Sequence, residues 1–138
     1  MIAIQNEGYP LEEEALQDLG ERIARRIGLK GSATIRLAPE AEVRAANRKF
    51  RRRDHVTDVL SFPLGEKLPD GLYAGDVLIC VPRAEAQARR QGHSLARELL
   101  LLMIHGLLHL KGLDHEADGG EMLARQGRLF AEFSRGVP

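Results

Sequence analysis

Residues 73–81 read YAGDVLICV, and this stretch decides the fold because positions 77–81 are apolar without interruption. A strand with one face in water alternates apolar and polar side chains, whereas a run that is apolar on both faces indicates a strand covered on both sides. We therefore predict that residues 73–81 form the central strand of a sheet. Cys80, the single cysteine, is then expected to be a buried core thiol and not a reactive one.

Shorter strands are predicted upstream of this segment. Residues 1–5 and 33–37 alternate or carry β-formers, and residues 57–62 read as a further strand that Pro63 stops. Residues 65–71 contain proline, aspartate and glycine, which are typical of a loop.

Helices are predicted where apolar residues recur every three or four positions. Pro10 opens the first, since proline is tolerated in a first turn. The second is predicted to place Val43, either Ala46 or Asn47, and Phe50 on one face. The predicted helices run from Pro10 to Gly28, from Pro39 onward, from Arg83 to Gln91, from Ser94 to about Leu110, and from about Gly120 to Ser134. This order predicts an α+β fold, a small sheet with about five helices around it, in one domain over residues 1–138.

Composition narrows the class of function. Lys plus Arg and Asp plus Glu number 20 each, which argues against a protein that coats nucleic acid through charge alone. Aromatic residues make up only 4%, so a large base-stacking surface is not expected. A local basic run nevertheless lies between Arg44 and Arg53. The apolar stretch 99–110 is too short to span a bilayer, and one cysteine without a secretory signal favours a reducing cytoplasm.

Three histidines carry the clearest chemical signal, in residues 105–115, which read HGLLHLKGLDH. His105 and His109 lie one turn apart on one helix face, and Gly112 can end the helix so that the chain brings His115 back. Three imidazoles suit Zn²⁺, and a fourth position left to water is typical of catalytic zinc. Such water has a pKa near ~7. Core histidines without a metal are the alternative, but the local sequence offers three imidazoles no other common partner.

The residues around the histidines do not identify the general base of the reaction. In the His-Glu-x-x-His helix of zinc proteases the glutamate is the base, whereas Gly106 stands there in this chain. We hypothesise that this glycine leaves room near the metal. Asp114 either orients a ligand histidine or is simply a turn residue. Glu98 lies two turns before His105, too far for a direct role without a long reach.

Four side chains outside this segment read as structural. His55 and His93 are expected at the surface beside turns, and Met103 and Met122 are expected in the core.

The segment 105–115 resembles the signature of the YbeY family, bacterial zinc-dependent endoribonucleases. The resemblance extends over most of the chain from about Asn47 onward, through Asn47, Phe50, Arg51, residues 57–63, residues 75–79, and Glu121 with Met122. It implies that His105, His109 and His115 bind one zinc ion and that Arg51 is a catalytic residue that handles RNA. It also implies a mixed sheet, with the metal site on a central helix and the following turn.

The resemblance further implies a substrate and partners. It indicates cleavage of single-stranded RNA in maturation of the 3′ end of 16S rRNA and in ribosome quality control, with the small ribosomal subunit and assembly factors as partners. Neither a membrane nor DNA is expected as a partner. Two other functions stay open: a non-catalytic, zinc-stabilised ribosome-assembly factor, and a metallohydrolase of another substrate.

Overall fold

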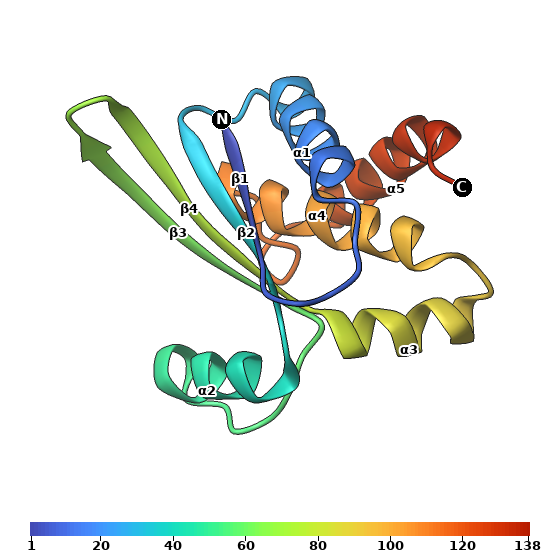
Figure 1. Ribbon diagram of the computed structural model, residues 1–138. Helices are drawn as coiled ribbons and strands as arrows, with labels where there is room; N and C mark the ends of the chain where they lie inside the picture. Colours follow the sequence, from blue (N-terminus) through green and yellow to red (C-terminus); the bar gives the residue numbers. More distant parts are fainter.

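A computed structural model describes residues 1–138, and Figure 1 shows its strands and helices. The strands are β1 (Ile2–Asn6), β2 (Ser32–Ala38), β3 (Val59–Leu68) and β4 (Gly71–Cys80). The helices are α1 (Glu13–Ile27), α2 (Glu40–Arg51), α3 (Val81–Gln91), α4 (Leu95–Lys111) and α5 (Glu121–Phe133), followed by a 3-10 turn, Ser134–Gly136. The α+β prediction is confirmed.

The sheet has the order β1-β2-β4-β3. Strands β1, β2 and β4 run parallel, and β3 is antiparallel to β4, so the sheet is mixed. Strand β4 lies between β2 and β3, with Val77 paired to Ile35 on one side and Ser61 on the other. Val77 and Ile79 are fully buried. The predicted central strand is confirmed.

Helix α4 is the buried centre of the helical layer and packs beside β3, β4, α1, α3 and α5. Ser94 caps its start, since its Oγ accepts a hydrogen bond of 3.2 Å from the backbone N of Arg97. Most of its residues are buried, as the apolar stretch predicts, including Met103. No helix is long and apolar enough to cross a membrane.

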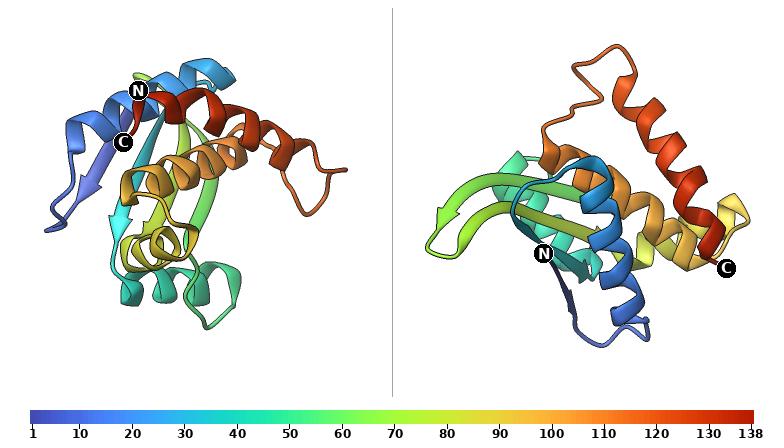
Figure 2. Two further views of the ribbon diagram at one scale, coloured as in Figure 1. Left: turned by 90° about the vertical axis from the view of Figure 1, so that its right-hand side faces the viewer. Right: turned by 90° about the horizontal axis from the view of Figure 1, so that it is seen from above.

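Helix α2 lies beside α3, near the end of the sheet where β2 finishes and β3 starts (Figures 1 and 2). A small second core joins it to the sheet through Val43, Ala38, Leu60 and Cys80. Cys80 is fully buried, which confirms its predicted place in the core, and burial raises the pKa of its thiol.

Strand β3 continues past Pro63, so the predicted stop there is wrong. Of the loop predicted over residues 65–71, only the turn at Pro69 and Asp70 is confirmed. The strand runs to Leu68 and forms a hairpin with β4, which begins at Gly71. Proline is tolerated because β3 is an edge strand, and the pairing register shifts between Pro63 and Glu66. This hairpin extends away from the helices in Figure 1.

The start of α1 also differs from the prediction. Pro10 does not open it, because Asn6 exchanges hydrogen bonds with the backbone of Tyr9 and holds a turn before the helix. The helix begins at Glu13, and Leu16, Leu19 and Ile23 lie on its buried face.

On α2 the predicted apolar face is wrong at Phe50, which is 62% exposed. Asn47 takes the inward position and donates a hydrogen bond of 3.0 Å from Nδ2 to the carbonyl of His55. This bond ties the end of α2 to the segment that leads into β3.

Candidate metal centre and its cleft

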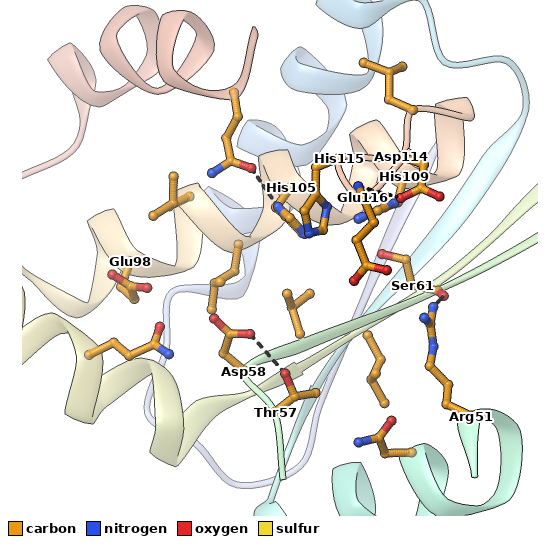
Figure 3. Close-up of a pocket in the computed structure, with 18 of the residues that line it drawn as sticks. Arg51, Thr57, Asp58, Ser61, Glu98, His105, His109, Asp114, His115 and Glu116 are labelled. Carbon is orange, nitrogen blue, oxygen red and sulfur yellow. Dashed lines mark hydrogen bonds between the residues drawn. The ribbon is translucent and has the colours of Figure 1, made fainter. Parts of the chain in front are cut away.

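Three imidazoles converge on the outer side of α4. His105 and His109 come from the helix, His115 comes from the segment after it, and one ring nitrogen of each lies within 4.8 Å of the other two. The ring centroids are 4.7 Å apart for His105 and His109, and 5.2 and 5.3 Å from each of these to His115. Figure 3 shows the three side chains pointing toward one another in a cleft. These three histidines could hold a metal ion.

The turn after α4 delivers His115. Gly112 has φ 109°, a left-handed conformation that favours glycine, and its N–H donates to the carbonyl of His109 at 3.0 Å. The carboxylate of Asp114 then accepts a hydrogen bond of 3.0 Å from the backbone N of Glu116. Asp114 therefore makes the contact of a turn residue, and its possible action on a ligand histidine stays a prediction.

Gln126 is a site residue that the sequence analysis did not find. It lies on α5, on the same face as the buried Met122 and Leu129, and its Oε1 is 2.7 Å from Nδ1 of His105. An amide oxygen only accepts, so Nδ1 of His105 carries the proton and Nε2 keeps a free lone pair. No sequence motif indicated this contact, because Gln126 lies 21 residues from His105 in the chain and on another helix.

The chemistry of the donor set fits a transition metal. Nδ1 of His115 is buried and has no hydrogen-bond partner, which a buried polar atom rarely tolerates. Burial, with the neighbouring His105 and His115, lowers the pKa of His109 and favours its neutral, ligating form. Three nitrogen donors suit zinc, nickel, copper or iron, and do not suit Mg²⁺ or Ca²⁺, which prefer oxygen.

Gly106 does not leave room near the metal, so that hypothesis is wrong. A Cβ at this position would lie 2.4 Å from Cγ1 of Val77 in β4. The glycine instead lets α4 pack closely on the central strand. A side chain at position 106, where the zinc proteases have their glutamate, would therefore point into the core and not toward the histidines.

The histidines open into a cleft of about 840 Å³, which Arg51 also lines. Arg51 is exposed at the end of α2, and its Nη2 donates a hydrogen bond of 2.9 Å to the carbonyl of Ser61 in β3. Arg53 and Arg90 line the same cleft. The structure thus brings the predicted arginine and the three predicted histidines to one cavity, although they come from separate elements (Figure 3).

The predictions for the four residues expected to be structural have different outcomes. His55 is exposed, as predicted, and Met103 and Met122 are fully buried in the core, as predicted. His93 is not a free surface residue, because its Nε2 lies 2.7 Å from Oε1 of Glu98. Glu98 is only 2% exposed, and this bond accounts for its burial beside the cleft.

Comparison with known proteins agrees with this geometry. The family model described as Endoribonuclease YbeY matches residues 2–134. Proteins named Endoribonuclease YbeY include one from Moorella thermoacetica, 43% identical over 143 residues, with 92% of each chain covered. Another, from Helicobacter pylori strain P12, is 42% identical over 134 residues, which cover 97% of this chain and 92% of the relative. A solution structure from Thermotoga maritima superposes with a TM-score of 0.69 and 33% identity, covering 97% of this chain and 89% of that one.

Proposed function

Because the chain belongs to the Endoribonuclease YbeY family, we propose that it hydrolyses phosphodiester bonds of single-stranded RNA with one zinc ion held by His105, His109 and His115. The observation that carries this proposal is the convergence of three imidazole nitrogens within 4.8 Å. The cleft around them also holds a guanidinium that can bind a phosphate.

The side chains of the cleft have distinct tasks in this proposal. When bound, zinc would supply a Lewis acid that lowers the pKa of a water ligand toward ~7 and polarises a phosphoryl oxygen. Arg51 would grip two phosphate oxygens with its planar fork and stabilise the charge that builds on them. Gln126 would hold His105 in the tautomer whose Nε2 is free. Gly106 supplies no base, so the proton acceptor belongs to another group.

Resemblance to the family supports a proposal for the cellular role. We propose that the chain, as one domain over residues 1–138, acts in the cytoplasm on the 3′ end of 16S rRNA and in ribosome quality control. The small ribosomal subunit and its assembly factors would be its partners. The zero net charge favours recognition through a local basic patch over coating of any RNA.

Cleavage of a single-stranded RNA oligonucleotide with the sequence of the 16S 3′ end tests the proposal. Protein stripped with a chelator should be inactive, and one equivalent of zinc should restore cleavage. His109→Ala should lose both zinc binding and cleavage, whereas His55→Ala, which changes an exposed histidine outside the cluster, should keep its zinc stoichiometry. Zinc-loaded protein that does not cleave would favour the non-catalytic assembly factor.

The variant Arg51→Lys distinguishes the effect of the positive charge from the effect of two-point hydrogen bonding to the phosphate. Lysine keeps the positive charge but cannot grip two oxygens, so kcat should fall about 10-fold to 100-fold. Unchanged cleavage by this variant would remove the bidentate role of Arg51 while leaving the metal site intact.

A further inference from the structure

Phe50 is the one phenylalanine or tyrosine ring that the fold leaves largely in solvent, with 62% of its surface exposed. The ring is nevertheless held in place, because it meets the ring of Phe62 in β3 at a centroid distance of 5.4 Å and an angle of 66°. Edge-to-face contact of this kind fixes the orientation of a ring. An exposed but oriented phenylalanine is thus available to a partner with a flat apolar surface.

The charges around Phe50 indicate what kind of partner this is. Two arginines of α2, Arg44 and Arg48, pair with Asp54. The remaining basic residues of this segment have no carboxylate partner within ion-pair distance: Lys49, Arg51, Arg52 and Arg53. Nζ of Lys49 lies 5.2 Å from the Phe50 ring. The ring therefore lies within unpaired positive charge, which complements a polyanion.

The patch is continuous with the cleft. Arg51 and Arg53, on the C-terminal side of Phe50, both line the cavity of the three histidines, and Figure 3 shows Arg51 reaching from α2 to β3 beside it. A strand whose phosphate is bound by Arg51 would bring its neighbouring nucleotide to the end of α2. A nucleic acid strand matches this surface, because its phosphates complement the positive charges and its flat bases can stack on the ring.

We infer that Phe50 is a stacking platform for one nucleobase of the RNA strand that enters the cleft. The inference rests on the proposed function and adds to it a contact that selects unpaired RNA. Bases inside an RNA duplex are stacked on one another, so an unpaired base is the one that can present its face to a side chain. Phe50 itself lies beside the cleft, next in sequence to Arg51, which lines it. The exposed leucines Leu64 and Leu68 of the hairpin offer no ring on which a base could stack.

Steady-state cleavage by the zinc-loaded protein tests the inference with three substitutions. Phe50→Ala should raise KM about 5-fold to 150-fold, the usual effect of removing one base–aromatic stack, with kcat little changed. Phe50→Tyr should retain the KM of the wild-type chain. Phe50→Leu should behave like Phe50→Ala, because leucine keeps apolar volume but offers no ring. Leu123→Ala, a change at a 50% exposed leucine on α5 outside the cleft, is the matched control.

A second measurement locates the stacked base. Removal of one base at a time from the oligonucleotide should reveal a position at which KM rises by the same factor as in Phe50→Ala. On that oligonucleotide Phe50→Ala should cause no further rise, as expected when both changes remove one contact.

Contrary outcomes are distinguishable. If Phe50→Ala leaves KM unchanged in a wild-type chain that cleaves RNA, the inference fails alone. If Phe50→Leu matches the wild type, the contact is only apolar, as with a protein partner, and stacking is excluded. If the zinc-loaded wild-type chain neither binds nor cleaves RNA, the proposed function fails and this inference with it.

Discussion

At the level of single residues, the proton on His105 is decided by one side chain outside the histidine motif. Gln126 accepts from Nδ1 of His105 at 2.7 Å and so leaves Nε2 without a proton, with a lone pair that can bind a metal ion. A partner of this kind fixes both tautomer and ring orientation of a ligand histidine. Helix α5 therefore contributes to the site although it supplies no ligand.

Gln126→Leu should weaken zinc binding about 10-fold to 100-fold, because the ring loses its acceptor and Nδ1–H is left unpaired. Gln126→Glu should bind zinc at least as tightly as the wild type, since a carboxylate accepts the same proton. Competition with a chromophoric chelator measures both. Arg128→Leu, on the exposed side of the same helix, is the control, and equal affinity in all variants would refute the positioning role.

The contrast between His109 and Gln126 shows what local sequence can predict. His105 and His109 share a face because four residues make one helical turn, and Gly112 marks where the chain reverses. These relations lie within one short segment. Gln126 reaches the site only because α5 docks on α4 through Met122 and Leu129. Such docking depends on the packing of the whole molecule, which no local pattern encodes.

At the level of secondary-structure elements, α4 and β4 meet at Gly106 and Val77. A methyl group at position 106 would lie 2.4 Å from Cγ1 of Val77. Val77 is fully buried in the central strand, and β-branched side chains are restricted at χ1, so it cannot move aside easily. Close helix–sheet packing here holds α4, and with it two of the three histidines.

Gly106→Ala should therefore destabilise the fold. Overpacking costs about 1–3 kcal/mol, offset by roughly 1 kcal/mol from the better helix propensity of alanine. Urea unfolding of Gly106→Ala, Val77→Ala and the double variant gives the coupling between the two positions. The double variant should lose less stability than the sum of the single changes, because the smaller side chain at 77 accepts the new methyl group. Additive losses would contradict this account.

A second pair of elements, β2 and α2, is joined by Arg36 and Glu42. Nε and Nη2 of Arg36 each donate a hydrogen bond of 2.8 Å to the carboxylate of Glu42. This bond lowers the pKa of Glu42 below its ordinary value of 4.5, against the opposing effect of burial. A lowered pKa in the folded state adds stability above the ordinary pKa, which is lost as pH falls through the folded value.

Glu42→Gln should thus reduce the free energy of unfolding at pH ~7 by about 1 kcal/mol, a modest value because the glutamate is partly exposed. As pH falls from the ordinary pKa of the carboxyl through its lowered value in the folded state, the variant and the wild type should converge. Urea unfolding at neutral and acidic pH measures the difference. Glu132→Gln, which breaks an exposed pair with Arg26, should have a smaller effect at both values. A difference that persists unchanged in acid would contradict the assignment.

Strand β3 shows why element boundaries were harder to predict than element types. Pro63 normally ends a strand, and the residues after it have loop composition. The strand continues because its outer edge has no neighbour and its inner edge pairs with β4 as far as Leu68 and Gly71. Whether a strand is at an edge depends on the order of the sheet. That order is a property of long-range pairing, whereas the apolar run of β4 is local.

At the level of the whole molecule, the histidine cluster is where three separate parts meet. Helix α4 supplies His105 and His109, the irregular segment 112–120 supplies His115, and α5 supplies Gln126. The hairpin of β3 and β4 lies on the other side of the molecule from α5 in Figure 1. The start of β3 lines the cleft, but the tip of the hairpin lies far from it, so a ligand at the cluster would leave that tip untouched.

Zinc binding should stabilise the folded chain and should do so regionally. A ligand that binds only the folded state adds about 2.7 kcal/mol at a free concentration 100 times its dissociation constant. Hydrogen exchange should slow in segment 112–120 and in α5, because a bound ion would tie His115 to His105, which Gln126 of α5 holds. Exchange in the tip of the hairpin should stay unchanged.

His115→Ala should abolish the protection of segment 112–120 even where residual zinc remains bound, since the other two imidazoles both belong to α4. Uniform protection of the whole chain, or protection that survives in His115→Ala, would mean that the metal does not join these parts.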